Sequence, residues 1–499
     1  MKAGVLRRGV ASAALACALA CALAWAFPLA VRADTLEQAL AQAYQNNPTL
    51  NSQRAVVRAT DETVPQALSG YKPTVRVTGT IGQEYTSTVG KTNNTRSVSV
   101  LTPTGGTANV SVSAPGVSYP RNAFGYSPNN VAATLTQNIY NGFQTANGVR
   151  LAEANTSAAR ETLRFAEQTV LLNGATAYMD LLRDGALLEL QRRNVEVLQE
   201  QLRQTRDRFI VGEVTRTDVA QAETRLAQGR AAVLTAESSY ARSRGTYRQV
   251  IGVEAGTLVP AAPVDRLTPR RLADAIAIAR ARHPTVGVAM FGIDAAVLQV
   301  KINEGTLYPT AQVVATLNNN WETNLTTQLQ AFNAFVQAQI SVPLYQGGAE
   351  YSRIRQAKET AGQKRLDLET ARDAVAYSPN NPVGVVPAWG QLEASKAQIL
   401  ATQAQVAASE IALNGVREEA RVGQRTTLDV LNAQQDLVTA RTALVTAQHD
   451  RVVASYILLA AVGELNLPKL GIMIPLYDPM VHYQQVRDAW IGVRIPDGR

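Results

Sequence analysis

An internal duplication constrains this chain more than any other feature of its sequence. The segment RFIVGEVTRTDVAQAE at 208–223 returns as EARVGQRTTLDVLNAQ at 419–434, so that Gly212 and Gly423 are separated by 211 residues. Other pairs match in the same way: Asp218 with Asp429 and Gly252 with Gly463, 211 residues apart, and Pro48 with Pro284 and Pro73 with Pro309, 236 residues apart. Such long periods are not those of a solenoid of short repeats. The sequence therefore predicts one structural unit that is used twice.

Each copy of this unit begins with two helices. A short helix leads through an Asn-Pro or His-Pro turn into a second helix, which a proline ends. The expected ranges are 36–46 and 49–70 in the first copy, and 271–282 and 285–306 in the second. We expect the first repeat to cover 34–262 and the second to cover 263–466.

Alternation with a period of two residues follows these helices. Val75, Val77 and Ile81 would lie on one face of a strand, opposite Arg76 and Thr78. The pattern predicts two strands in each repeat, at about 74–86, 131–140, 310–322 and 334–345, and a loop rich in Gly, Ser, Thr, Asn and Pro at 87–130. Strands with one apolar and one polar face suit a sheet between lipid and water. An ordinary antiparallel sheet with one exposed face would have the same pattern.

Long helical patterns follow each return strand. They predict helical hairpins at about 142–252 and 348–463, whose outgoing helices of about seventy residues would extend roughly 105 Å. Apolar residues recur every seven positions along the returning helices, as at Val219 and Leu226 in the first repeat and at Val430 in the second. Sustained heptads predict coiled-coil packing. The chain is therefore expected to be mainly α-helical, with two strands and long coiled-coil helices in each repeat.

The duplicated motif marks the turn of each hairpin. Gly212 and Gly423 stand where a glycine commonly follows the last residue of a helix. Thr215 and Thr426 each precede an aspartate by three residues, a spacing typical of a capping box at the start of the returning helix. We therefore expect two tight helical turns.

Two segments depart from the repeat. The stretch 377–387 places Pro379, Pro382 and Pro387 inside an expected helix, and an interior proline costs about 3 kcal/mol. This predicts a bulged loop between two helical halves, which a functional contact and a tolerated surface insertion would explain equally well. The tail 467–499 has too little periodicity for a core helix, and we expect it to pack on the outside of the helices.

The first 33 residues predict a secretory signal peptide. MKAGVLRR provides a basic start, an apolar stretch follows it, and Val31-Arg32-Ala33 resembles a small-residue cleavage site. An uncleaved membrane anchor is an alternative. Cys17 and Cys21, the only cysteines of the chain, both lie in this segment, and lipidation of either is a second alternative. No other apolar run is expected to reach the ~18 residues of a membrane helix.

Composition argues against nucleic-acid binding and against catalysis. Four of the basic residues behind the net charge of +8 lie in the first 33 residues, and the remaining excess of about +4 is unremarkable for 499 residues. His283, His449 and His482 are the only histidines and lack metal-ligand spacing. The sequence has no phosphate loop, dinucleotide fingerprint or nucleophile elbow. We expect no enzyme activity, no cofactor and no nucleic-acid partner.

Several of these motifs together resemble the TolC family of outer-membrane efflux and secretion channels. The resemblance rests on NNPTL and YKPT near the start, LTQNIYNG at 135–142, ISVPLYQGG at 340–348 and two VGxxTxxDV turns, and it covers about 34–470. It implies a trimeric α/β barrel in which each protomer gives four strands to a twelve-stranded membrane barrel, while the helices extend into the periplasm. Physical chemistry agrees on association, because four strands cannot close a barrel and open edges are not tolerated in lipid.

The resemblance also implies a gate at the hairpin turns. Asp429 matches the position of an aspartate ring, which is a candidate cation site, and Arg425 matches a locking basic residue. Thr217 and Asp218 match lock positions on the first hairpin. Three ionised copies of Asp429 around an axis would repel one another and favour a bound cation. The turn residues implied to meet a periplasmic partner are Val211, Gly212, Thr215, Val422, Gly423 and Thr426.

Two residues depart from the family pattern at this gate. Asn432 stands where a second ring acid would be, and Ala420 stands where the best-known pattern has a tyrosine. These departures imply a weaker closure and a lower affinity for divalent cations.

The resemblance implies a passive exit duct. The chain would be the outer-membrane channel of a tripartite efflux or type I secretion system, working with a periplasmic membrane-fusion adaptor and with an inner-membrane pump or ABC transporter. Two other classes stay open. A periplasmic coiled-coil tether would need one hairpin and no amphipathic strand pairs, and a trimeric surface adhesin would use the 87–130 loop as its binding tip. The sequence does not identify the cargo.

Overall fold

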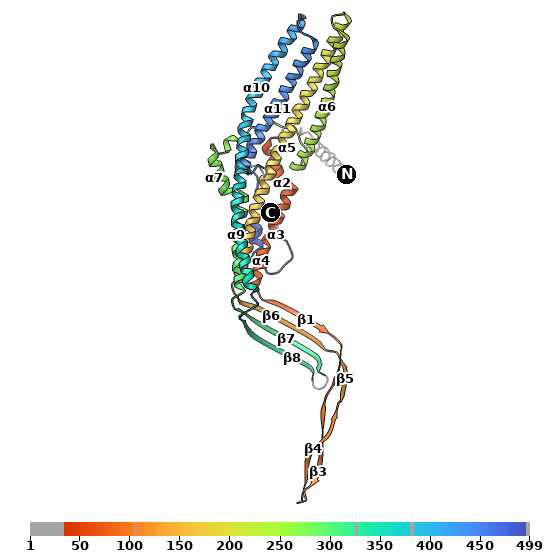
Figure 1. Ribbon diagram of the computed structural model, residues 1–499, viewed down its shortest axis with the longest axis vertical. Helices are drawn as coiled ribbons and strands as arrows, with labels where there is room; N and C mark the ends of the chain where they lie inside the picture. Colours follow the sequence, from red (N-terminus) through yellow and green to blue (C-terminus); the bar gives the residue numbers. More distant parts are fainter. Residues whose placement is uncertain (1–33, 104, 325–327, 380–383, 496–499) are drawn as a thin grey trace, which may run out of the picture. The chain divides into compact units, whose positions relative to one another are not determined.

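The computed structural model of the protein describes residues 34–103, 105–324, 328–379 and 384–495, which form two compact units. The first unit is helical and comprises the described parts of 1–62, 152–296 and 360–499. The second unit, 63–151 and 297–359, contains all the strands (Figure 1). The predicted signal segment 1–33 lies outside the described residues.

Each repeat opens with the expected helices. The first repeat has α2 (Leu36–Asn46) and α3 (Pro48–Asp61), followed after Glu62 by α4 (Thr63–Leu68) and the 3₁₀ turn η1 (Ser69–Tyr71). The second has the 3₁₀ turn η2 (Asp265–Leu267), α7 (Leu272–Arg282) and α8 (Pro284–Gly305). Asn47 caps α3 by accepting hydrogen bonds from the backbone of Thr49 and Leu50, and Pro48 occupies the first helical turn, where a missing N–H is harmless. The single helix expected at 49–70 is therefore interrupted at Glu62.

The long hairpins follow the strands. In the first repeat α5 (Gln144–Ile210) runs out and α6 (Arg216–Ile251) returns; in the second, α9 (Ala349–Tyr377) and α10 (Val385–Arg421) run out and α11 (Thr427–Val462) returns. The outgoing path of the second hairpin is thus broken within the segment 377–387, part of which (380–383) lies outside the described residues. Pro387 falls in the first turn of α10, where it breaks no helical hydrogen bond.

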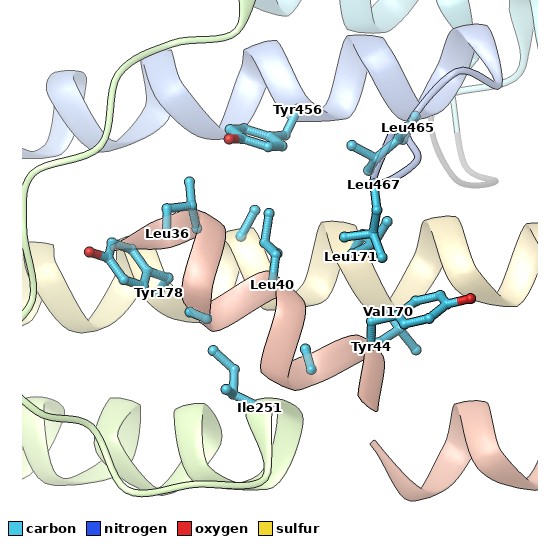
Figure 2. Packing of buried hydrophobic residues seen from close by; sticks show 14 of the residues in the cluster. Leu36, Leu40, Tyr44, Val170, Leu171, Tyr178, Ile251, Tyr456, Leu465 and Leu467 are labelled. Atoms are coloured by element: carbon cyan, nitrogen blue, oxygen red, sulfur yellow. The ribbon is translucent and has the colours of Figure 1, made fainter. Parts of the chain in front are cut away.

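The largest apolar core of the helical unit surrounds α2. Leu36, Leu40 and Tyr44 point from α2 toward side chains of α5 and α11 (Figure 2). Tyr178 of α5 is fully buried, and its hydroxyl donates to the carbonyl of Val259, 2.6 Å away. Burying the aromatic ring stabilises the fold through its large apolar surface, and burying the hydroxyl costs little because it is hydrogen-bonded. The N-terminal segment is therefore part of the core.

The C-terminal segment also packs on the helical unit. Asp478 caps the short helix α12 (Pro479–Val486), which lies against α3. His482 of α12 and Asp61 of α3 are both buried, and His482 Nδ1 lies 3.1 Å from Asp61 Oδ2. Burial raises the pKa of Asp61, and the contacts with His482 and Arg160 oppose that shift.

The four-stranded sheet has the order β1-β6-β7-β8, and each neighbouring pair is antiparallel. The strands are β1 (Thr74–Ile81), β6 (Asn129–Asn141), β7 (Thr310–Asn324) and β8 (Gln328–Ser341). β1 ends before the expected residue 86, and β8 covers Gln328–Ser341 instead of the expected 334–345, so these boundaries differ from the prediction. β1 and β8 are the edge strands, and neither has a further partner in the described part of the chain.

The register places opposite kinds of side chain on the two faces of this sheet. Val75 pairs with Leu135, Leu135 with Ala315, and Ala315 with Val336, so one row across the sheet is wholly apolar. The next row on the other face is Arg76, Thr134, Thr316 and Phe335, and a further row joins Gln312 to Gln339 by a hydrogen bond of 2.9 Å. The expected alternation of apolar and polar side chains therefore holds at most positions, with Phe335 as an exception in the polar row.

The segment 87–130 was expected to be a loop, and this expectation is wrong. It contains β3 (Thr92–Leu101), β4 (Thr107–Ser118) and β5 (Arg121–Tyr126), while β2 (Glu84–Val89) precedes and overlaps it. β2 pairs with β5, and β3 pairs with β4. Serine and threonine are common in loops, but they also fit a pleated ribbon whose backbone groups pair across the hairpin.

One helical stretch is apolar enough to cross a membrane, which the sequence reading did not anticipate. Among the described residues, Leu272–Gly305 contains a window of 18 residues with a mean hydropathy of 1.5, of which only 11% is buried. His283 interrupts the stretch with an extended backbone, so it consists of α7 and α8 rather than one helix. Most apolar side chains of α8 are therefore only partly buried by the other described residues.

We predict that Gly142→Ala destabilises the corner between β6 and α5. Gly142 has a φ of +63°, and a Cβ atom there would overlap the carbonyl oxygen of Gly305 at the end of α8. Strain of this kind costs about 1–3 kcal/mol. Thermal melting followed by circular dichroism should show a lower melting temperature. Gly148→Ala is the matched control, because a Cβ there meets nothing within 4 Å and alanine favours a helix; equal melting temperatures for the two variants would contradict the prediction.

Candidate functional site

The turn of the first hairpin is built as the sequence predicts. Gly212 has a φ of +79°, and its N–H donates to the carbonyl of Phe209 at 3.0 Å. Thr215 is the N-cap of α6, and its hydroxyl and the Asp218 side chain form a capping box. These hydrogen bonds satisfy the free backbone groups at both helix ends, so a short turn suffices to reverse the chain.

The second turn repeats this geometry. Gly423 has a φ of +80°, and Thr426 forms a capping box with Asp429 at the start of α11. The hydrogen bond from the backbone N–H of Thr426 to Asp429, followed by that from the Thr426 hydroxyl, lowers the pKa of Asp429. Hydrogen bonding to Thr215 lowers the pKa of Asp218 in the same way. Both carboxylates are therefore ionised at neutral pH.

The residues assigned to the gate do not bridge the two hairpins within one chain. Arg425 bonds to Glu419 of its own hairpin at 2.9 Å, and Asp218 and Asp429 bond to their capping threonines. Thr217 is exposed, and so are Val211 and Val422 at the turns, with 77% and 69% of their surface accessible. In the described part of a single chain, no group of three acidic, histidine or cysteine side chains could hold a metal ion.

A different set of contacts joins the hairpins, between one and two turns along α11. Leu431 is 2% exposed and packs among Leu198, Leu202, Ala222 and Leu226, which belong to α5 and α6. A leucine of the second hairpin therefore completes the apolar core of the first.

Polar side chains surround this leucine. Arg225 of α6 donates to the side-chain oxygen of Asn432 at 2.8 Å. Gln434 accepts from Arg417 at 3.0 Å and donates to Asn194 of α5 over a longer distance of 3.5 Å. Asn194 and Gln434 are both buried. We call Asn194, Arg225, Leu431, Asn432 and Gln434 the hairpin seam.

The sequence reading noted Asn432 only as a departure from a family pattern, and it missed the rest of the hairpin seam. Asn194 directly precedes the heptad residue Val195, and Gln434 lies four residues after the heptad residue Val430, so the heptads did not single out either residue. Beside the seam lies a cleft of about 710 Å³, whose lining includes Glu196, Glu200, Arg208, Arg417 and Arg421.

A second polar network joins the hairpins farther from the turns. His449 of α11 is buried, with Nε2 2.9 Å from Asp180 Oδ1 of α5 and Nδ1 2.8 Å from Asp450 Oδ1. The Nε2 contact is poorly aligned for a hydrogen bond and is chiefly electrostatic. Arg183 bridges Asp180 and Asp184 at 3.0 and 2.9 Å. The hydroxyl of Ser243 in α6 donates to Asp184, so the network reaches all three helices.

The charges of this network shift the pKa values of its members. Burial lowers the pKa of His449, but the carboxylates of Asp180 and Asp450 outweigh burial and raise it above its ordinary value, against the opposing charge of Arg183. The contact with His449 lowers the pKa of Asp180.

Comparison with known proteins identifies the family. A model of the outer membrane efflux protein family matches residues 39–253 and 275–464, which contain both hairpins and all four strands of the sheet. The chain belongs to the outer membrane efflux protein family. It is 38% identical over 470 residues to the outer membrane efflux protein BepC of Brucella suis biovar 1, with 94% of each chain covered. It is 25% identical over 450 residues to the outer membrane protein TolC of Escherichia coli strain K12, covering 87% of this chain and 83% of TolC.

Solved structures show the same fold. The outer membrane protein VceC of Vibrio cholerae superposes with a TM-score of 0.64 at 17% identity, covering 86% of this chain and 96% of VceC. The CmeC outer membrane channel of Campylobacter jejuni gives a TM-score of 0.65 at 14% identity, covering 91% and 89%. The predicted family and TolC-like fold of this efflux protein are therefore confirmed. Its predicted outer-membrane location and its assignment as a protein other than an enzyme are confirmed by the family.

We predict that His449 stabilises this efflux protein more at low pH than at high pH. His449 binds its proton more tightly in the folded chain, so its contribution is complete below the unfolded pKa of about 6.5 and is lost as pH rises through the folded value. His449→Gln should lower the melting temperature at pH 6, because it removes the positive charge that faces Asp180 and the hydrogen bond between Nδ1 and Asp450.

The pH dependence distinguishes this account from a simple packing defect. The difference between His449→Gln and the unaltered protein should shrink by pH 9. Gln448→Ala, a change at an exposed neighbour on α11, should have the same small effect at both pH values. A loss of melting temperature in His449→Gln that does not change with pH would contradict the assignment.

Proposed function

We propose that this chain is the outer-membrane exit duct of a tripartite efflux or type I secretion system and that it acts as a homotrimer. The amphipathic sheet carries this proposal, because its apolar face suits lipid and its polar face suits a water-filled lumen. Repeats 34–262 and 263–466 would each supply two of its strands. The relatives include proteins named for both activities: BepC is an efflux protein, and AprF of Pseudomonas aeruginosa is an alkaline protease secretion protein.

Two surfaces support association of the chain with copies of itself. The edge strands β1 and β8 present backbone groups that would be unsatisfied in lipid, and pairing with neighbouring copies would satisfy them. The apolar side chains of α8, most of them only partly buried in a single chain, would gain further cover from a neighbouring copy.

The duct would be passive. An inner-membrane pump or ABC transporter would supply the energy, and a periplasmic membrane-fusion adaptor would meet the hairpin turns. The exposed Val211 and Val422 beside Gly212 and Gly423 offer apolar contacts for that adaptor. A tether without conduction would have no use for an amphipathic sheet, which is why we favour the duct over that alternative.

The hairpin turns would form the gate of the duct. Asp429 is half-buried and ionised, so three copies around the axis would repel one another and attract a divalent cation. Within each copy, the hairpin seam would hold the second hairpin against the first. The Arg225–Asn432 hydrogen bond would contribute where the family pattern has a second acid.

Conductance of the purified protein in a planar bilayer tests the duct and its cation site. We expect steady single-channel conductance that divalent cations added on the hairpin side reduce. Asp429→Asn should abolish that block, because the amide keeps an oxygen for the capping box and loses only the charge. Asp218→Asn makes the matched change at the first turn and should leave the block in place. A folded trimer without conductance would contradict the duct, and an unaltered block in Asp429→Asn would contradict the cation site.

We also predict that Arg225→Met loosens the closed state. Methionine keeps the length and apolar stem of the side chain and removes the hydrogen bond to Asn432. A hydrogen bond to a charged group contributes about 1.5–3 kcal/mol, so the open probability in the bilayer should rise by roughly tenfold or more. Arg230→Met, at an exposed position one turn farther along α6, should behave as the unaltered protein. Equal open probabilities for the two variants would contradict a role for Arg225 in closure.

A further inference from the structure

The strands β2 to β5 form a two-stranded ribbon that extends the β1–β6 pair. Only Gly82 and Gln83 separate β1 from β2, and the N–H of Gly82 donates to the carbonyl of Pro128 at 3.2 Å across the joint. The N–H of Gly90 donates to the carbonyl of Pro120 at 3.0 Å across the next joint. Backbone pairing therefore continues from the sheet to the tip of the ribbon.

The ribbon lies at the end of the sheet opposite the helices. Asn141 pairs with Thr310, and Thr310 pairs with Ser341, so the strand ends that connect to α5, α8 and α9 are together at one end. The ribbon leaves from Ile81 and Asn129 at the other end. In an outer-membrane channel whose helices extend into the periplasm, this end faces the outside of the cell.

One face of the ribbon carries a stripe of valines. Val98 pairs directly with Val110, and Val100 pairs with Ala108, so these four side chains share a face. The three valines are 41–49% exposed, and no third strand covers either ladder. Ser97, Ser99 and Asn109 lie on the opposite face, where Ser99 donates to Asn109 at 2.7 Å. We call Val98, Val100 and Val110 the valine stripe.

An isolated ribbon of this kind lacks sufficient support of its own. A two-stranded hairpin is marginally stable in water, and three or more strands or a covering element are needed for independent stability. The exposed edges and the valine stripe would both gain from a partner. The described part of the chain offers no such partner.

We propose that the valine stripes of neighbouring copies pack against one another, so that the ribbons associate above the mouth of the channel. This inference rests on the trimer of the proposed function. A three-fold axis brings three identical ribbons out at the same level, each continuing the edge strand β1, which the proposed trimer already pairs with another copy. The ribbon contact is thus continuous with the barrel interface.

The charge pattern favours another copy over a lipid or a charged partner. Residues 97–120 contain no Asp, Glu, Lys or Arg, and Arg96, two residues before Val98 in β3, is the first charged residue on the sheet side, so the tips of identical ribbons can meet without like-charge repulsion. The same stretch has no basic side chain to pair with a lipid phosphate, and it lacks the edge charges that usually keep strands apart. The ribbons would then narrow the outer opening of the duct.

Cysteine cross-linking on intact cells tests the contact. Cys17 and Cys21 are the only native cysteines and lie in the predicted signal segment, so a single introduced cysteine provides the signal. Val98→Cys should form covalent dimers of the chain with a short bifunctional maleimide and should react weakly with a maleimide that does not cross membranes. Ser97→Cys, on the opposite face, should react with the impermeant reagent and give few dimers.

A second variant separates the stripe from general proximity. Val100→Thr with Val110→Thr in the Val98→Cys chain keeps the β-branched shape and removes apolar surface, and it should lower the dimer yield at least several-fold. Equal reactivity of Val98→Cys and Ser97→Cys without dimers would overturn the proposal, as would cross-linking of Val98→Cys to a different molecule. If trimers and conductance persist in that case, only the ribbon contact fails; if no trimer forms, the proposed function fails as well.

Discussion

Unsatisfied backbone groups at the two edges of one sheet are the constraint on which the account of this protein depends. The order β1-β6-β7-β8 leaves β1 and β8 without partners in the described chain, although the register gives the sheet one apolar and one polar face. In water such edges are solvated, but in lipid each unpaired group costs several kcal/mol. The apolar face of the sheet favours contact with lipid, but the unpaired backbone groups at its edges are unfavourable there. Both conditions are met only when several copies of the chain pair their edge strands and close the sheet. The apolar and only partly buried helix α8 is consistent with the same conclusion.

The two long hairpins use the same sequence motif at their turns. Each turn combines a left-handed glycine with a Thr-x-x-Asp capping box, which holds the aspartate in a fixed and ionised position. Among the described residues, the hydrogen bonds of Asp218 and Asp429 stay within their own turns. Contact between the hairpins is made by Leu431 and the polar side chains around it, and farther along by His449. The capping boxes thus position the aspartates, whereas other residues hold the two hairpins together. A change of charge at a turn should therefore leave the hairpin seam intact.

Local patterns predicted much of this fold because they act over short distances. The duplicated Gly and Thr-x-x-Asp motifs fixed the turns, and the alternation around Val75 fixed the faces of the sheet. The ribbon at β2 to β5 was missed because serine, threonine and asparagine are typical of loops, and only pairing across the hairpin reveals a ladder. The bond between Arg225 and Asn432, 207 residues apart, depends on the rotation of two packed helices. No pattern within either helix encodes that rotation.

The most direct test of the central claim is the number of copies in the folded channel, measured by native mass spectrometry of the protein extracted in mild detergent. Closure of the sheet between copies predicts a single species with three copies of the mature chain, and no stable folded monomer. A folded monomer, or a dimer that survives dilution, would contradict the account, because the edges of β1 and β8 would then need no neighbour.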